Sequence, residues 1–310
     1  MTYLTIFSAP KPFTNPHIAT IQRNAIHSWT KLGAEVQIVL VGNEAGVKEA
    51  AAEAGVGFEP DVELNAEGTP LISSIFAIGR SLNDSPMLAF INTDIIVFPE
   101  LLSTIRGVAA QREKFLLVGQ RWDLDVQEEL ELGAGWEERL RQRLSAQGRL
   151  HPPAGSDYFV YPRACFGDVP RFAVGRAGWD NWMIFKARWE HWPVIDATQD
   201  IQIIHQDHDY SHLPGGQPHY RLPETFENVR LAGGKRTIFH LEDSDWLLTN
   251  GALSRPRFNW TWLKRELETF PLVSLHSFAL AQCAYALFHP QKAYVDFRGW
   301  MRMRAHGPQP

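Results

Sequence analysis

Residues 87–100 read MLAFINTDIIVFPE, and this stretch decides the fold. Two apolar runs, 87–91 and 95–98, enclose the polar triplet NTD. A run this apolar predicts a strand buried on both faces, as in the middle of a parallel sheet. Burying a lone carboxylate is costly unless something pairs with it. Asp94 therefore either holds a ligand, or it only ends the strand as a turn former or helix cap.

The residues before this strand alternate between two periodicities. Short β-rich runs occur at 3–7, 35–41 and 56–58, and helical spacing of apolar residues occurs at 18–32, 47–54 and 71–82. This order of strands and helices predicts a mostly parallel central sheet with helices on both faces. Ligands of such sheets bind beyond the carboxyl ends of the strands, which is where Asp94 falls.

The pattern changes after the decisive stretch. We expect a helix at 101–110, a strand at 115–119 and a charged helical excursion at 126–150. The second half has short strands, many aromatic residues and polar turns. The sequence contains no Gly-rich phosphate loop of the Walker or Rossmann type, which counts against kinases and NAD enzymes.

Composition limits the partners and the location. The chain has 310 residues, a net charge of −5 and two cysteines, Cys165 and Cys283. The negative net charge argues against nucleic acid as a partner. Two cysteines are too few for a disulfide framework. The first residues lack signal-peptide features, and the most apolar segment, 270–288, is interrupted by proline and polar residues. We therefore expect a cytoplasmic protein, at most peripheral at the inner face of a membrane; Trp260 and Arg298 would suit that surface, or are simply solvated.

The triplet after the buried strand resembles the DxD motif of the GT-A glycosyltransferases, with Asn92 in place of the first Asp. The resemblance implies a Mg²⁺ or Mn²⁺ ion that neutralises a nucleotide-diphosphate leaving group. Such an ion needs a hard carboxylate oxygen, so Asp94 is the expected metal ligand. Asn92 would contact the ribose or a metal-bound water, and Thr93 would contribute to substrate binding.

A second motif is GWDNW at 178–182, before a helix expected at 183–189. Relatives in glycosyltransferase family 2 place a catalytic carboxylate at the start of a helix near the acceptor, and Asp180 matches that place. The resemblance implies that Asp180 is the base of an inverting transferase. Trp179 and Trp182 would stack on the acceptor, and Asn181 would bind substrate. The alternative is a helix cap between two core tryptophans.

A third motif is the histidine-rich run IQIIHQDHDYSH at 201–212. Many GT-A enzymes complete their metal site with a late histidine, which implies His205 first and His208 second. The run is also consistent with a solvated turn. With His212 its spacing resembles a zinc site, so a zinc hydrolase is an alternative function.

Other loops offer weaker candidates for substrate binding. The loop after the first strand is the usual base-binding place in GT-A folds, and an aspartate before an apolar strand could hydrogen-bond sugar hydroxyls or merely hold a turn. The further candidates are Ser8, Ala9, Pro10, Glu44, Arg80, Arg121 and Asp157.

The resemblance covers roughly residues 1–215. It implies an α/β, GT-A-like (Rossmann-like) catalytic domain at 1–240, with a nucleotide-sugar half at 1–125 and an acceptor half at 150–240, followed by a C-terminal helical extension at 241–310. The implied activity is metal-dependent transfer of a sugar from a UDP- or GDP-type donor to a sugar or lipid-linked acceptor. Eleven tryptophans would suit sugar stacking or a Trp-rich core, so a non-catalytic sugar-binding protein is the other alternative.

Overall fold

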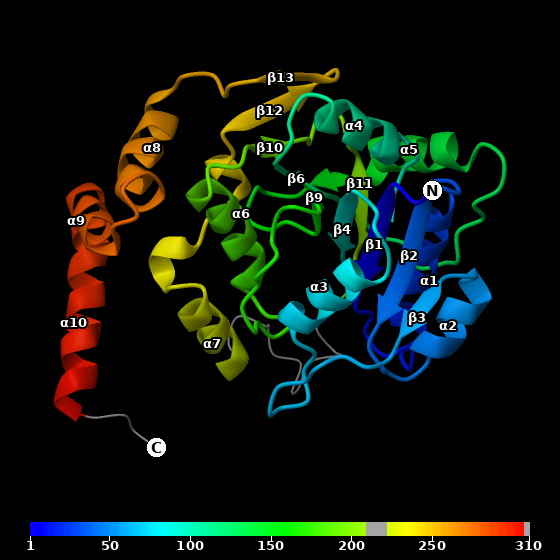
Figure 1. Cartoon of the computed structure of the whole chain (residues 1–310), viewed down its shortest axis with the longest axis horizontal. Coiled ribbons are helices and arrows are strands. Elements are labelled where there is room, and N and C mark those ends of the chain that lie inside the picture. The colour runs from blue at the N-terminus through cyan, green and yellow to red at the C-terminus, as the bar shows by residue number, and fades with distance from the viewer. Residues whose placement is uncertain (209–221, 307–310) are drawn as a thin grey trace. The chain divides into compact units, whose positions relative to one another are not determined.

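The computed structural model describes residues 1–208 and 222–306. These residues form two compact units. The first comprises Met1–Ala187 and Trp192–Pro256, and the second comprises Arg188–His191 and Arg257–Pro310. Figure 1 labels most of their helices and strands.

The first unit is built on a nine-stranded sheet with the strand order β13-β12-β10-β6-β9-β4-β1-β2-β3 (Figure 1). Its strands are β1 Leu4–Ser8, β2 Val36–Val41, β3 Gly57–Glu59, β4 Met87–Ile91, β6 Leu116–Val118, β9 Tyr158–Pro162, β10 Val194–Asp196, β12 Trp246–Thr249 and β13 Ala252–Ser254. Neighbouring strands are parallel except where β9 pairs with β4 and β6 and where β13 pairs with β12. The predicted mostly parallel sheet is confirmed.

Helices cover both faces of this sheet. The helices of the first unit are α1 Pro16–Thr30, α2 Val47–Ala54, α3 Ile72–Ser81, α4 Glu100–Ala109, α5 Trp136–Gln147, α6 Trp179–Trp189 and α7 Pro223–Leu231; the last two residues of α6 belong to the second unit. The boundaries of α1 follow from local chemistry, because the Asn15 side chain accepts hydrogen bonds from the first turn and Pro16 is compatible with the first helical position. The charged segment expected to be helical over 126–150 is helical only in α5.

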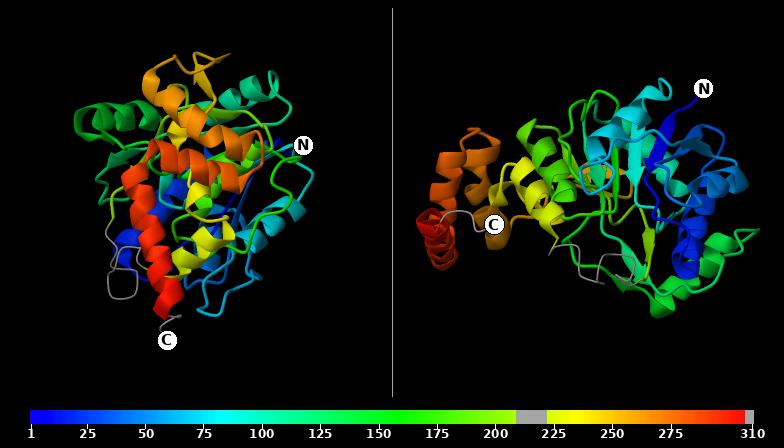
Figure 2. Two further views of the ribbon diagram at one scale, coloured as in Figure 1. Left: turned by 90° about the vertical axis from the view of Figure 1, so that its left-hand side faces the viewer. Right: turned by 90° about the horizontal axis from the view of Figure 1, so that it is seen from below.

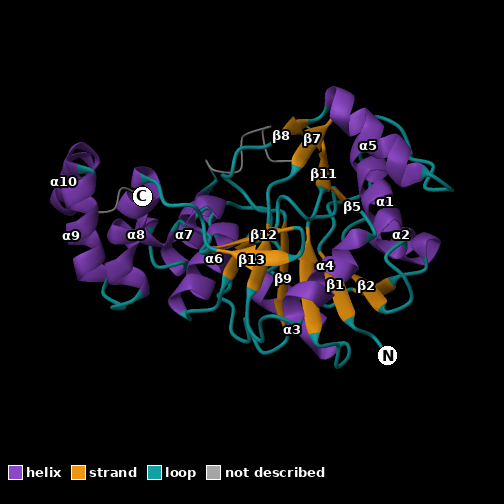
Figure 3. Cartoon of the chain, turned by 90° about the horizontal axis from the view of Figure 1, so that it is seen from above, coloured by secondary structure: helices purple, strands orange, loops and turns teal. Residues whose placement is uncertain are grey.

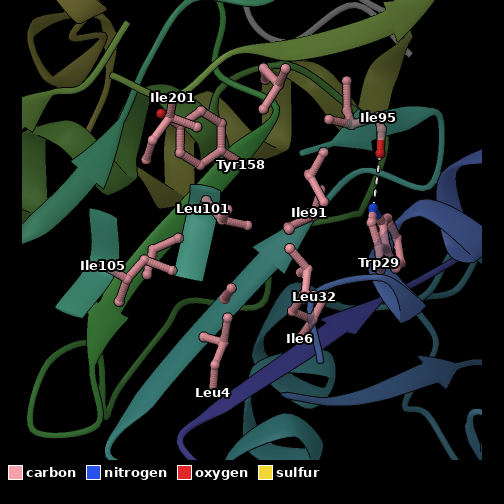
Figure 4. Packing of buried hydrophobic residues seen from close by; sticks show 14 of the residues in the cluster. Leu4, Ile6, Trp29, Leu32, Ile91, Ile95, Leu101, Ile105, Tyr158 and Ile201 are labelled. Atoms are coloured by element: carbon pink, nitrogen blue, oxygen red, sulfur yellow. Dashed lines mark hydrogen bonds between the residues drawn. The ribbon is translucent and has the colours of Figure 1, made fainter. Parts of the chain in front are cut away.

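The alternation of side chains along β4 explains why the strand is apolar throughout. Ile91 points into a cluster that includes Trp29 of α1 and Leu101 of α4 (Figure 4). Phe90 points to the other face, where its ring lies 5.1 Å from that of Trp179 of α6. Successive residues of a strand face opposite sides, so a strand covered on both sides needs apolar residues at every position.

The second apolar run of the decisive stretch enters a different sheet. This four-stranded sheet has the order β5-β11-β7-β8 and comprises β5 Ile95–Val97, β7 Trp122–Leu124, β8 Arg149–Leu150 and β11 Ile203–Gln206 (Figure 3). The indole Nε1 of Trp29 donates a 2.9 Å hydrogen bond to the carbonyl of Ile95, which ties β5 to α1 (Figure 4). The polar triplet therefore lies where the chain passes from one sheet to the other.

The second unit is helical, as expected for a C-terminal extension. Its helices are α8 Trp260–Val273, α9 Phe278–Phe288 and α10 Pro290–His306, coloured orange to red in Figure 2. The chain turns between α8 and α9, so the apolar segment 270–288 is not one helix; Ser277 caps α9. Residues 241–256, assigned to the extension from the sequence, contribute β12 and β13 to the large sheet. Within the described ranges, no helix is long and apolar enough to cross a membrane.

Candidate active site

A cavity of about 730 Å³ opens at the carboxyl edge of the large sheet. The loops that follow β1 and β4 line it, and so does the segment that precedes β9. Because β9 runs antiparallel to β4, its beginning lies at the edge where β4 ends. The N-terminal turn of α6 and residues of β7 and β11 complete the lining.

Asp94 lies in this cavity with two histidines and a lysine. His208 Nε2 is 3.1 Å from Asp94 Oδ2, and Lys11 Nζ is 3.1 Å from the same oxygen. Lys11 Nζ is also 3.0 Å from His208 Nε2. One ligand atom each of Asp94, His205 and His208 lies within 4.8 Å of the others, which is close enough for one metal ion.

Strand pairing brings these distant residues together. β11 runs antiparallel to β5, and His205 lies opposite Ile95, the residue after Asp94. The backbone N–H of Gln206 donates to the carbonyl of Asp94 at 3.2 Å. The second sheet thus holds the histidine-rich segment beside the polar triplet. His212 lies outside the described residues.

The electrostatics of Asp94 fit a cation. Burial alone would raise the pKa of its carboxyl, but the Lys11 ammonium and the hydrogen bond from His208, with the charges of both histidines, hold the pKa well below its usual range. Its Oδ1 is buried and has no hydrogen-bond partner among the residues that the structure describes. A buried carboxylate oxygen normally has a partner, and a metal ion would provide one. A carboxylate with two imidazoles is a donor set suited to Mn²⁺ or Zn²⁺ more than to Mg²⁺, which prefers oxygen ligands.

Asp180 lines the same cavity from the first turn of α6. The helix begins at Trp179, earlier than the sequence predicted, so Asp180 is inside the helix and its Oδ1 accepts a 3.1 Å hydrogen bond from the N–H of Gly178. Burial raises the pKa of this carboxyl, although backbone N–H groups partly offset the effect. A carboxylate with a raised pKa is a stronger base than an exposed one.

Asp157 is the centre of a hydrogen-bonded group. Its Oδ1 accepts from the Asn92 side chain at 2.9 Å, and its Oδ2 forms a 2.8 Å ion pair with Arg121. Both oxygens therefore have protein partners, and Asp157 fixes two side chains that line the cavity. Asn92 donates one N–H of its amide to Asp157, which leaves its second N–H and its carbonyl oxygen for a ligand.

Asp123 is a cavity residue that the sequence did not single out. It accepts hydrogen bonds from Arg121 at 2.9 Å and His151 at 2.8 Å, and its Oδ1 lies 3.4 Å from His205 Nδ1. Burial would raise the pKa of Asp123, but His205 and His151 beside it and the charge of Arg121 lower it strongly. Asp123 and His151 lie on or beside short strands of the second sheet, whose pairing has no signal in the sequence.

The remaining candidates divide between the cavity and the core. Trp179 touches the cavity but is only 5% exposed, with its ring packed against Phe90 and Phe159, and Trp182 is packed against Phe172. Asn181 also lines the cavity, yet its amide donates to the carbonyl of Phe239. The cavity is also lined by Ala9, Pro10, Glu44 and Thr93.

Besides Trp182, two candidates lie away from the cavity lining. Ser8 is fully buried, and its hydroxyl is bonded to the carbonyl of Ile91 and, at 3.0 Å, to Thr93. Arg80 donates to the backbone carbonyls of the turn at 163–166. The guanidinium of Arg80 therefore stabilises a turn after β9, and the structure does not bring it to the expected nucleotide.

Comparisons with known proteins give structural similarities only. No family model and no curated protein sequence matches this chain. A structure of M. tuberculosis glucosyl-3-phosphoglycerate synthase is 15% identical with a TM-score of 0.47, covering 75% of this chain and 81% of that one. Another, of the same protein with Mn²⁺, UDP and glucosyl-3-phosphoglycerate, is 14% identical with a TM-score of 0.44, at 75% and 81% coverage.

A structure of S. aureus TarS 1–349 is 10% identical with a TM-score of 0.39 and covers 67% of this chain and 59% of that chain. All three likenesses are at low identity. The residues of the cavity itself must therefore carry any conclusion about activity.

Proposed function

We propose that this chain is a metal-dependent glycosyltransferase that moves a sugar from a nucleotide-diphosphate donor to an acceptor hydroxyl. The observation that carries the proposal is the buried Oδ1 of Asp94, which has no hydrogen-bond partner within residues 1–208 and 222–306 and lies beside two histidines in a cavity that also contains Asp180. A cation site for the leaving diphosphate and a separate carboxylate base for the acceptor are the two elements that an inverting, metal-dependent transfer uses. The UDP and Mn²⁺ in the M. tuberculosis synthase structure agree with this donor class.

Asp94, His205 and His208 would hold the ion, and the two imidazoles of this set favour Mn²⁺ over Mg²⁺. When bound, the ion supplies positive charge that offsets the charge gathering on the diphosphate as the sugar leaves. Lys11 lies at the same place and provides a second positive charge for a phosphate oxygen. Ala9, Pro10 and Glu44, on the loops after β1 and β2, form the end of the cavity proposed for the base and ribose.

Asp180 is the proposed base of an inverting reaction. Its carboxylate accepts the proton of the acceptor hydroxyl while the acceptor oxygen forms a bond to the anomeric carbon. The bond from that carbon to the phosphate oxygen breaks, and its electron pair leaves with the nucleoside diphosphate. If the configuration is instead retained, Asp180 positions the acceptor.

Arg121 and Asp157 act by positioning. Arg121 joins Asp157 to Asp123, and Asp157 in turn orients Asn92 at the end of β4. Held in this way, the polar residues after β4 need little rearrangement when a donor binds. The acceptor would be a sugar or a lipid-linked sugar.

Titration calorimetry with UDP and GDP, with and without Mn²⁺, tests the proposal on the wild type, on Asp94→Ala and on Asp61→Ala as an exposed control. Binding that needs Mn²⁺, is lost in Asp94→Ala and is kept in Asp61→Ala supports the transferase. Absence of nucleotide binding together with tight Zn²⁺ binding would overturn it and favour a zinc hydrolase. Sugar binding that survives Asp94→Ala, without nucleotide binding, would indicate a non-catalytic sugar-binding protein.

A further inference from the structure

The second unit has an unusual surface. Of the 16 large hydrophobic residues exposed in the described chain, 12 lie between Phe258 and Met301. They include Trp260 at 77% exposure, Leu287 at 76% and Val295 at 67%. Isolated apolar residues are normal on a surface, but a concentration of this kind marks an interaction site.

The apolar surface has an uncharged centre. Residues 269–291 contain no Asp, Glu, Lys or Arg, and α9 lies within this stretch. On α9 the exposed residues include Phe278, Leu280 and Leu287. A helix that is hydrophobic on all sides is typical of a buried position, so the outer side of α9 is suited to contact with an apolar partner.

Basic residues flank this uncharged stretch in the sequence. Residues 257–310 carry seven Lys and Arg against three Asp and Glu, whereas the other 256 residues carry 23 against 32. The acidic chain thus ends in a cationic unit. Lys264 on α8 and Lys292 and Arg298 on α10 lie on either side of the uncharged stretch in the sequence.

Aromatic residues lie at the start of α8. The rings of Phe258 and Trp260 are 5.7 Å apart in an edge-to-face arrangement, and both side chains are exposed. Tyr294 on α10 is also exposed. Tryptophan and tyrosine are enriched at the level of lipid headgroups, because one part of each ring system is apolar and another part is polar.

We propose that the second unit docks onto the surface of an anionic lipid bilayer. Apolar residues of α8 to α10 enter the boundary between headgroups and acyl chains, and the flanking Lys and Arg contact the anionic headgroups. Charge complementarity favours lipid over a second copy of the same surface, since two cationic units would repel each other. The proposal rests on the C-terminal helices alone and is independent of the proposed transfer reaction.

Flotation of the full chain with vesicles tests the proposal. We expect binding to phosphatidylcholine vesicles that contain about 30% phosphatidylglycerol, and weaker binding to vesicles of pure phosphatidylcholine. Binding should be lost as the salt concentration is raised. The combined change Trp260→Ser and Leu287→Gln should weaken binding by about tenfold or more, because it removes two large apolar groups from the interface.

The matched control is Phe226→Gln on α7, which removes an exposed hydrophobic residue, 67% exposed, from the first unit. Binding of this variant should equal that of the wild type, and thermal melts should show that both variants fold. Equal loss of binding in the control and the double variant would contradict the proposal. The proposal would also be contradicted if light scattering without lipid showed that the wild type is a dimer and the double variant a monomer. If the wild type did not bind vesicles, the membrane proposal would be overturned, and the outcome of the nucleotide titration would be unaffected.

Discussion

Lys11 and Asp94 are 83 residues apart in the chain, yet the lysine Nζ lies 3.1 Å from the aspartate Oδ2. The ammonium therefore lies on the carboxylate that would hold a metal ion, at Oδ2 and not at the buried Oδ1, and it also contacts His208. A cation that binds Asp94 must compete with this lysine in the absence of nucleotide. A diphosphate would give the ammonium a new partner.

Lys11→Met is therefore expected to have opposite effects on two affinities. Mn²⁺ alone should bind the variant roughly tenfold more tightly, because a like charge near the site is removed. UDP in the presence of Mn²⁺ should bind roughly tenfold more weakly, because a phosphate loses a charge-assisted hydrogen bond. Calorimetry measures both, with Lys48→Met as the exposed control. Weaker Mn²⁺ binding by Lys11→Met would show that the lysine supports the cation site instead of competing with it.

Asp180→Asn should remove the base and leave the donor site intact. We expect kcat to fall by about 10²- to 10⁴-fold, which is the usual contribution of a general base, with UDP affinity unchanged. Asp168→Asn, at an exposed position, is the control. In the wild type, kcat/KM should fall on acidification at a pH above the ordinary aspartate pKa of about 3.9, because burial raises the pKa of Asp180. A variant with normal kcat would exclude Asp180 as the base.

The raised pKa of Asp180 also predicts a change in stability. A carboxyl whose pKa is higher in the folded state contributes stability below its unfolded pKa and loses that contribution as the pH rises through the folded pKa. At pH 7.5 the wild type therefore buries an unfavourable charge, and Asp180→Asn should have the higher Tm. The difference should shrink as the pH falls through the raised pKa. A Tm advantage that is the same at pH 7.5 and pH 4.5 would argue against this cause.

Arg121 and Asp157 should be energetically coupled. Arg121→Met leaves the Asp157 carboxylate without its ionic partner in a buried position, and we expect a loss of about 3 kcal/mol in the free energy of unfolding. Adding Asp157→Asn should restore part of the loss, because the uncompensated charge is gone. Urea unfolding of the two single variants and the double variant gives the coupling energy. Strictly additive effects would mean that the ion pair is not what stabilises this region.

The sequence by itself determined the layered α/β architecture. Apolar runs such as 87–91 and the helical spacing at 47–54 depend on local periodicity, and the structure places β4 and α2 at these residues. The position of Asp94 at the end of a buried strand followed from the same pattern. The apolar strand after Asp157 and the helix near Asp180 followed from the same kind of pattern, although only a resemblance suggested roles for these two aspartates.

Only the tertiary structure decided which of these residues meet. Nothing in the run 87–98 shows that its second half joins another sheet, and the pairing of β5 with β11 alone places His205 beside Asp94. Asp123 reaches the same place on β7, and Arg80 bonds to a turn instead of facing the cavity. The physical reason is that periodicity records whether a residue is buried, whereas strand pairing between distant segments decides what it is buried against.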